Sequence, residues 1–218
     1  MNPSPLRGSL ASLGAGYRQA VRRTRSMDIY AKAVENVWSA LVSGRIFPNQ
    51  VFTLGWRHYR FFDADLMLDR DFIGLTNQLL ELEGAKCACM VNVDTGTNAE
   101  VLPSTIQLDQ RSPTETFAAV TQEPINWLTC MVNLGASSDL GGWCAYCEPM
   151  AEIAVIAFRS SELYERAGNI LAGLQAGTVK QQLAEPKIYV FMHAAMNPGY
   201  FEQLAAEYSE VAETEQGA

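Results

Sequence analysis

The chain has 218 residues, of which 48% are hydrophobic and 18% are charged, and its formal net charge is −8. This apolar share is typical of a chain that folds around a core, so wholesale disorder is excluded. The longest apolar run, the six residues 153–158, is far shorter than the ~20 residues of a membrane-spanning helix, so we expect no membrane partner.

Charge is distributed unevenly along the sequence. Residues 1–27 contain five arginines and no acidic residue, whereas the rest of the chain contains 11 basic and 24 acidic residues, a net charge of −13. We interpret residues 1–26 as a basic N-terminal arm, with an Arg-rich organelle transit peptide as the alternative. Residues 27–208 are predicted to form one domain, and residues 209–218 an acidic tail that frays.

Periodicity predicts helices and strands in alternation over the first half of the chain. Apolar residues at helical spacing indicate helices over residues 27–42 and 70–83, the second of which ends before Gly84. A strand is predicted over residues 51–56. Residues 86–93 alternate as a strand does, with the side chains of Cys87, Cys89, Val91 and Val93 on one face.

The middle of the chain is predicted to contain short elements joined by loops. Residues 105–108 read as a strand, and a capping box from Ser112 to Glu115 predicts a helix that ends before Pro124. A strand is predicted over residues 125–134. The small and polar residues 135–142 are predicted to form a flexible loop.

The last third is predicted to begin with a hairpin. Its strands span residues 143–147 and 152–158, and the second is apolar on both faces, which indicates an interior strand. The later elements are a helix over 162–174, a short helix that Thr178 and Gln181 cap, a last strand over 187–192, and a helix that Asn197 and Pro198 begin.

Consecutive strands joined by tight loops favour antiparallel pairing. We therefore predict an α+β fold, with a mainly antiparallel central sheet of about five to seven strands and flanking helices.

Five cysteines are an odd number and too few for a disulfide scaffold. Cys87 and Cys89 share a face with valines, and Cys144 and Cys147 are predicted to lie on opposite faces of one strand, which disfavours a chelating pair. We therefore interpret the cysteines as small, buried, reduced side chains, typical of a cytoplasmic protein. A zinc site and a reactive thiol, with Cys147 as the candidate nucleophile, are the alternatives.

Two further features of the sequence are candidates for catalysis, a histidine and a pair of glutamates. His193 is predicted to end an apolar strand at a loop, where active residues often lie. Glu148 and Glu152 flank the predicted hairpin turn, and two carboxylates there are either an acid–base pair or solvated turn residues. The sequence contains no nucleophile elbow, phosphate loop or dinucleotide motif.

The segment over residues 56–62 is rich in aromatic residues and arginine. It is the candidate for partner binding, because such residues are enriched at protein interfaces. Two other interpretations are a junction with aromatic side chains turned inward and an Asp-based metal site. The candidate partner-binding residues are Trp56, Arg57, Tyr59, Asp63 and Asp65.

The acidic charge and the lack of a catalytic motif favour a non-catalytic, cytoplasmic binding protein, such as an inhibitor or a toxin-neutralising immunity protein. We expect a basic protein as its partner, since opposite charge steers association. Nucleic acid is a disfavoured partner, and no cofactor or metal is expected. The alternatives are a small-molecule enzyme that uses a cysteine or His193, and a subunit of a larger assembly.

Overall fold

The computed structural model describes residues 30–68, 70–94, 105–108 and 132–209. Its centre is a sheet with the strand order β1-β6-β5-β4-β2-β3, in which every neighbouring pair is antiparallel. The predicted α+β fold is therefore confirmed, and six strands lie within the predicted range. The strands are β1 (Arg57–Asp63), β2 (Ala88–Asn92), β3 (Thr105–Leu108), β4 (Leu134–Ser138), β5 (Trp143–Glu148) and β6 (Ile153–Phe158).

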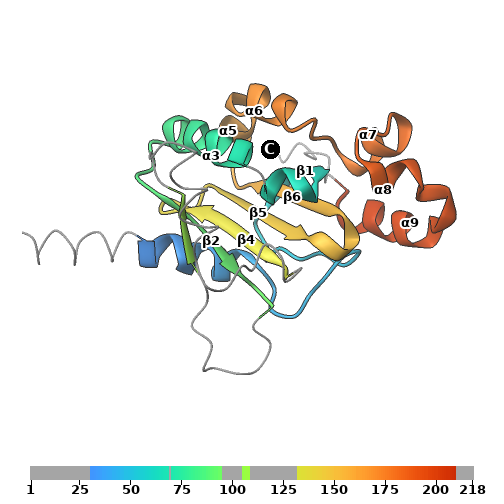
Figure 1. The fold of residues 1–218 in the computed structure, drawn as a ribbon, viewed down its shortest axis with the longest axis horizontal. Helices are drawn as coiled ribbons and strands as arrows, with labels where there is room; N and C mark the ends of the chain where they lie inside the picture. Colours follow the sequence, from blue (N-terminus) through green and yellow to red (C-terminus); the bar gives the residue numbers. More distant parts are fainter. Residues whose placement is uncertain (1–29, 69, 95–104, 109–131, 210–218) are drawn as a thin grey trace, which may run out of the picture.

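Four helices cover one face of the sheet (Figure 1). Their apolar side chains, such as Phe72 and Leu163, pack with Met90, Trp143 and Ile156 from the strands. Burial of these side chains supplies the main driving force for folding on this face. The helices are α2 (Ala64–Leu68), α3 (Arg70–Glu83), α5 (Ser161–Arg166) and α6 (Gly168–Gly173).

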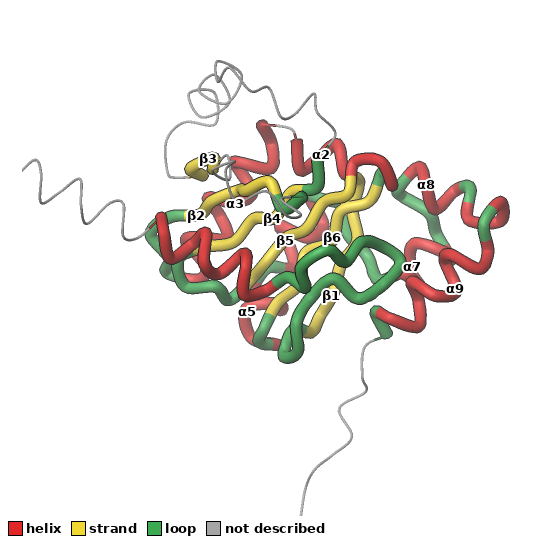
Figure 2. Tube along the Cα trace, turned by 90° about the horizontal axis from the view of Figure 1, so that it is seen from below, coloured by secondary structure: helices red, strands yellow, loops and turns green. Residues whose placement is uncertain are grey.

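The opposite face is covered by the first described helix (residues 30–40), the segment that follows it, and three C-terminal helices (Figures 1 and 2). Aromatic rings dominate this layer: Phe47, Phe61, Tyr146 and Tyr208 meet edge-on or tilted at centroid distances of 5.1–6.0 Å. The C-terminal helices are α7 (Val179–Ala184), α8 (Tyr189–Met192) and α9 (Pro198–Glu207), with the short 3-10 turn η2 (Ala194–Met196) between the last two.

The β5–β6 hairpin confirms the prediction for this part of the chain. The 3-10 turn η1 (Pro149–Ala151) joins the two strands, and β6 lies inside the sheet between β1 and β5. Val155 and Ile156 belong to the cores on opposite faces of the sheet, as expected. The predicted helix over 70–83, the strands over 86–93 and 105–108, and the capping box of Thr178 and Gln181 are also confirmed.

The loop predicted over residues 135–142 is correct for residues 139–142 but wrong for residues 135–138, because Leu134–Ser138 forms β4, every residue of which is buried. The small residues permit close packing against the helix over residues 30–40. A Cβ atom on Gly135 would lie 2.5 Å from Cγ1 of Val37 and 3.0 Å from Cδ1 of Leu41. The small side chains of β4 therefore allow the helix to approach the strand closely, and they do not indicate a flexible loop.

The strands predicted over residues 51–56 and 187–192 are also corrected. The first segment contributes only an isolated bridge between Phe52 and Leu41, and the strand itself begins at Arg57. The second contains helix α8, where Ile188 and Phe191 are buried three residues apart, which is helical spacing.

Two predicted helices differ in detail. The helix predicted over 162–174 divides at Ala167 into α5 and α6. Helix α9 begins at Pro198 as predicted, but the Asn197 side chain makes no capping hydrogen bond. The helix predicted from Ser112, most of the strand predicted over 125–134, the arm over 1–26 and residues 210–218 of the tail lie outside the described residues.

Candidate functional site

The five residues predicted to bind a partner are divided between the two ends of β1. Trp56 and Arg57 stand at its start, whereas Asp63 ends the strand and Asp65 lies in α2. A strand of seven residues separates the two groups by about 20 Å. The five side chains therefore do not form one compact surface.

Trp56 belongs to the core, and Tyr59 is partly buried against it. Only 5% of Trp56 is exposed, and the guanidinium of Arg159 lies 4.7 Å above its ring. The hydroxyl of Tyr59 donates a hydrogen bond of 2.6 Å to the Trp56 carbonyl, and its ring stacks on Phe52. Partner binding by Trp56 required an exposed ring, so Trp56 is not a binding anchor.

Asp63 and Asp65 lie instead among other carboxylates. Asp63 of β1 and Glu148 of β5 both pair with Ile153, the residue between them on β6. The negative charges of Asp65, Asp63 and Glu148 add to the effect of burial in raising the pKa of the Cys147 thiol, so all three lie near it. Asp94 in turn raises the pKa of Glu148. We call this group the acidic end of the sheet: Asp63, Asp65, Asp94, Glu148 and Glu152.

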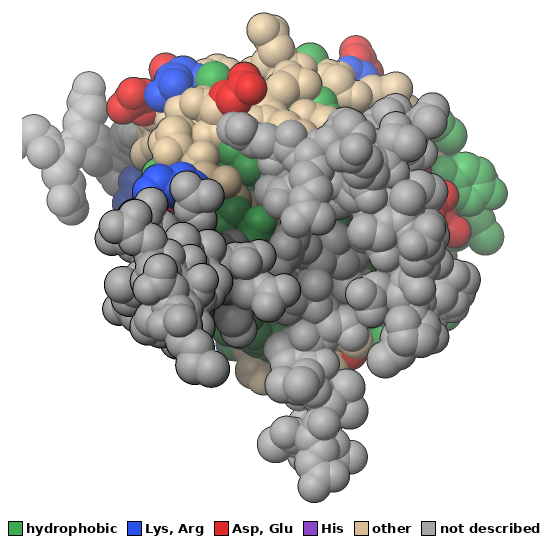
Figure 3. All heavy atoms as spheres, turned by 60° about the vertical axis from the view of Figure 1, so that its left-hand side comes forward, with side chains coloured by type: hydrophobic (Ala, Val, Ile, Leu, Met, Phe, Trp, Pro, Cys, Tyr) green, Lys and Arg blue, Asp and Glu red, His purple; other side chains and the backbone are tan. Residues whose placement is uncertain are grey.

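Among the described residues, none of these five carboxylates forms an ion pair; the pairs found there, such as Lys32–Glu35 and Arg166–Glu162, lie on other elements. Along the upper rim of the view in Figure 3, by contrast, acidic and basic side chains lie next to one another. Among the described residues, the acidic end therefore presents negative charge that no neighbouring base neutralises.

Glu148 is the most constrained of these residues. Its Oε2 accepts hydrogen bonds from the backbone N–H of Phe47, at 3.0 Å, and from the hydroxyl of Tyr146, at 3.4 Å. Partial burial nevertheless raises the pKa of Glu148 above its ordinary value. Glu152 is exposed on the other side of the turn with a left-handed backbone (φ 58°). The described contacts thus give the two glutamates different environments and no shared hydrogen bond.

Exposed apolar side chains accompany the acidic end. Met150, in the turn between Glu148 and Glu152, is 72% exposed, and Ile46, next to Phe47, is 48% exposed. A protein interface combines an apolar centre with a polar rim, and these side chains supply both kinds of group.

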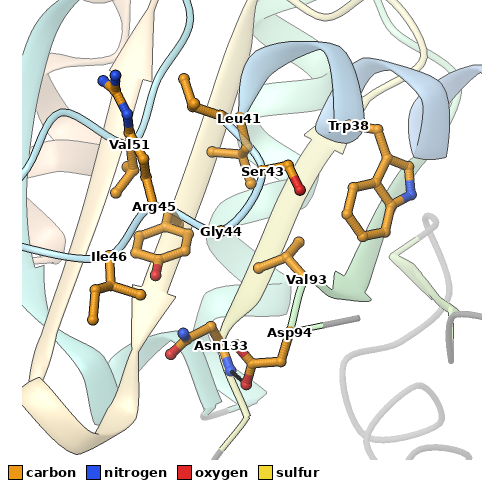
Figure 4. Close-up of a pocket in the computed structure, with 12 residues that line it drawn as sticks. Trp38, Leu41, Ser43, Gly44, Arg45, Ile46, Val51, Val93, Asp94 and Asn133 are labelled. Carbon is orange, nitrogen blue, oxygen red and sulfur yellow. Dashed lines mark hydrogen bonds between the residues drawn. The ribbon is translucent and has the colours of Figure 1, made fainter. Parts of the chain in front are cut away.

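A pocket of about 220 Å³ opens beside this end of the sheet, between the segment 41–46 and the adjoining ends of β2 and β4 (Figure 4). Leu41, Ile46, Val51 and Val93 supply apolar walls, and Trp38 and Tyr146 supply aromatic rings. Because Asp94 is part of its lining, we call it the Asp94 pocket.

The polar groups of the Asp94 pocket are held in place by hydrogen bonds. The backbone N–H of Asn133 donates to Oδ2 of Asp94 at 2.7 Å, and the N–H of Asp94 donates to Oδ1 of Asn92 at 2.9 Å. The Arg45 side chain extends away from Asp94 and Asn133 (Figure 4), and its Nη1 donates to the carbonyl of Gln50 at 3.2 Å. Asp94 is the one acidic residue among the described residues that line the pocket.

The described cysteines, Cys87, Cys89, Cys144 and Cys147, lie elsewhere and are buried. Cys144 and Cys147 lie on opposite sheet faces, as predicted. Burial raises the pKa of Cys89 to about 12 and that of Cys144 and Cys147 further still. Because the thiolate is the reactive form, these thiols are poor nucleophiles. Cys130 lies outside the described residues.

His193 is exposed and caps the end of helix α8, not a strand. Its ring meets Tyr189 edge-on at 4.6 Å. The hydrogen bonds among the described residues give the His193 side chain no carboxylate or nucleophile as partner, so the geometry of a catalytic pair is not present there.

Comparisons with family models, curated proteins and solved structures find no match to this chain. Across the described ranges, no group of three or more His, Cys, Asp or Glu side chains is arranged to hold a metal ion. None of the helices in that part of the chain has both the length and the hydropathy of a membrane span.

Sequence reasoning named Asp63, Asp65 and Glu148 but missed Asp94, Asn133 and the segment 41–46. Asp94 and Asn133 are polar residues that lie far apart in the sequence. They become neighbours only because β2 pairs with β4, with Asn92 opposite Leu134. The pocket therefore depends on the strand order, which cannot be predicted from a local sequence pattern.

Proposed function

We propose that this protein is a non-catalytic, acidic binding protein that acts in the cytoplasm and takes a basic protein as its partner, in the manner of an inhibitor or a toxin-neutralising immunity protein. The observation that carries the proposal is the acidic end, where five carboxylates without an ion pair among the described residues adjoin the exposed side chains of Met150 and Ile46.

The two kinds of group contribute differently to binding. Unpaired carboxylates attract a basic partner before contact and raise the association rate. Apolar side chains such as Met150 lose water in the complex and slow its dissociation. Asp63 and Asp65 remain the predicted partner-binding residues, now with Glu148, Glu152 and Asp94. Arg57, at the far end of β1, is outside this surface.

The enzyme alternative has less support. Its candidate residues were Cys147, His193 and Glu148, and these lie in three different settings. The Cys147 thiol is buried, with its pKa raised, in the core beneath the helices, whereas His193 is exposed at the end of α8. No pair of them shares a hydrogen bond among the described contacts of the chain.

The assembly-subunit alternative has one observation in its favour. Tyr189, Met192 and Met196, on α8 and η2, are large apolar side chains that are mostly exposed. Sedimentation of the purified protein tests it: a dimer or larger oligomer that Met196→Glu dissociates favours assembly through this surface.

Capture of partners from the native host tests the main proposal. The bait is the wild-type protein, the double variant Asp63→Lys/Asp65→Lys, or the control Glu81→Lys/Glu165→Lys, which changes the net charge equally on the exposed sides of α3 and α5. We expect a basic protein that binds the wild type and the control but not the first variant. Equal capture by all three baits, or a small molecule turned over by the wild type but not by Cys147→Ala, contradicts the proposal.

A further inference from the structure

The Asp94 pocket has the size of a site for one side chain. Its volume of about 220 Å³ is below the roughly 300–1,000 Å³ of sites that hold a cofactor or a drug-sized molecule. Anchor residues at protein interfaces fill well-packed pockets, and Trp, Tyr and Arg predominate among these anchors. The pocket borders the acidic end, since Tyr146 lines it and donates a hydrogen bond to Glu148.

Its chemistry distinguishes among these anchors. Leu41, Val51 and Val93 provide an apolar wall, which suits the hydrocarbon stem of a long side chain. Oδ2 of Asp94 accepts the N–H of Asn133, and Oδ1 has no partner among the described residues. A positively charged donor would complete the coordination of this carboxylate.

The local charges favour a cation as well. Asp94 and Glu148 are close enough for each charge to affect the other. Among the described residues that line the pocket, the only cation is Arg45, which donates to the carbonyl of Gln50. The rings of Trp38 and Tyr146 line the same space, and the face of an aromatic ring attracts a guanidinium.

The site is also preorganised. The backbone of Gly135 lies against Val37, Leu41 and Val93, so the helix and the strands around the pocket are packed in contact. Two hydrogen bonds fix the Asp94 backbone and carboxylate, as described above. Little ordering is then required when a ligand enters, and this lowers the cost of binding.

We infer that the Asp94 pocket receives an arginine side chain of the basic partner, with the hydrocarbon stem against Leu41 and Val93 and the guanidinium paired with Asp94. This inference rests on the proposed function, because it assigns one contact of that interface. The planar guanidinium suits the site better than a lysine ammonium, since it donates in a fork to a carboxylate and also stacks on aromatic rings.

Titration with N-acetyl-L-arginine amide, followed by NMR of the Trp38 indole and the Val93 methyl groups, tests the inference. Neutral N-acetyl-L-citrulline amide has nearly the same shape and isolates the contribution of charge. We expect the arginine compound to shift these resonances and the citrulline compound to bind at least about tenfold more weakly, since a hydrogen bond to a charged group contributes about 1.5–3 kcal/mol.

Two variants localise the effect. Asp94→Asn removes the charge at nearly constant shape and should weaken binding of N-acetyl-L-arginine amide about tenfold. Asp65→Asn removes a carboxylate of the acidic end that does not line the pocket, and should change this affinity less than about twofold. Equal binding of the citrulline compound, shifts confined to other residues, or an unchanged affinity of Asp94→Asn overturns the inference. The citrulline comparison uses wild-type protein, so it stands even if Asp94→Asn does not fold.

Failure of this inference and failure of the proposed function are distinguishable. Absence of pocket binding, together with capture of a basic protein that depends on Asp63 and Asp65, rejects only the arginine pocket. Pocket binding without such capture rejects the partner surface and leaves a site for free guanidinium compounds.

Discussion

Glu148 and Glu83 are half-buried glutamates that each hold a backbone N–H in place. Glu148 accepts from Phe47, and Oε1 of Glu83 accepts from Gly142 at 2.6 Å. Burial raises the pKa of both above the ordinary 4.5. A neutral acid retains an oxygen that can accept these hydrogen bonds, so the charge itself is what the folded state disfavours.

The stability of the protein should therefore depend on pH through these two residues. Because their folded pKa values are raised, the folded state holds more protons than the unfolded state above about pH 4.5. Their contribution is fully present below that pH and is lost as pH rises through the folded pKa. We expect Glu83→Gln and Glu148→Gln to flatten the fall in unfolding free energy as pH rises above about 4.5, measured by urea denaturation.

Glu185→Gln is the matched control for the loss of one carboxylate, since Glu185 is exposed in the segment after α7. If Glu185→Gln flattens the profile as much as the other two variants, the buried glutamates are not the cause.

The thiols give a second prediction at this scale. Cys87, Cys89, Cys144 and Cys147 are buried, and burial raises the pKa of the last three. They should react slowly with a thiol reagent in the native protein and quickly after denaturation, with each site followed by mass spectrometry. Fast labelling of Cys144 or Cys147 in the native state would show a reactive thiol and revive the enzyme alternative.

At the scale of elements, sequence patterns correctly predicted the helices and strands that depend on neighbouring residues in the sequence. Helix α3, strand β2 and the β5–β6 hairpin follow from apolar spacing, from Gly84 at the helix end and from the short turn that Glu148 and Glu152 flank. Strand β4 was missed because its small residues are required by the helix that packs against it. The same limit applies to the site: Glu148 and Asp63 were named individually, but their common neighbour Ile153 follows from the strand order.

Gly135 tests the interpretation of β4. Gly135→Ala would place a Cβ atom 2.5 Å from Val37, on a β-branched side chain of the facing helix, so one of the two elements must shift. Overpacking of this kind costs about 1–3 kcal/mol, which thermal or urea unfolding would detect. The control is Gly74→Ala in α3, where nothing lies within 4 Å of the added carbon. There we expect a gain of about 0.5–1 kcal/mol from helix propensity. Similar effects at the two glycines would contradict the account of β4.

Strand β6 gives the second prediction for an element. Val155 is fully buried in the aromatic layer of the sheet. Val155→Asp buries a carboxylate without a partner and should cost about 3–5 kcal/mol, with Val155→Ala as the control for lost volume. An unchanged melting temperature of the Val155→Asp variant would show that this face of β6 is accessible to water.

At the scale of the whole molecule, the sheet collects charge that the sequence distributes widely. Asp63, Asp94 and Glu148 are 85 positions apart at most, yet the order β1-β6-β5-β4-β2 places them at one end. Carboxylates without ion pairs among the described residues give one end of the sheet an acidic pole, whereas the described side chains along the upper rim in Figure 3 carry both signs. Such a pole acts mainly on the rate of encounter with a basic partner.

The salt dependence of the association rate is the most direct test of the acidic partner surface, once the captured partner is purified. Salt screens exposed charges over a Debye length of ~8 Å at physiological ionic strength. For the wild type and for Glu81→Lys/Glu165→Lys, stopped-flow association should slow steeply as salt rises, with little change in dissociation. For Asp63→Lys/Asp65→Lys, association should be slow already at low salt and nearly independent of salt. An association rate that all three proteins share at every salt concentration would contradict a partner surface at the acidic end.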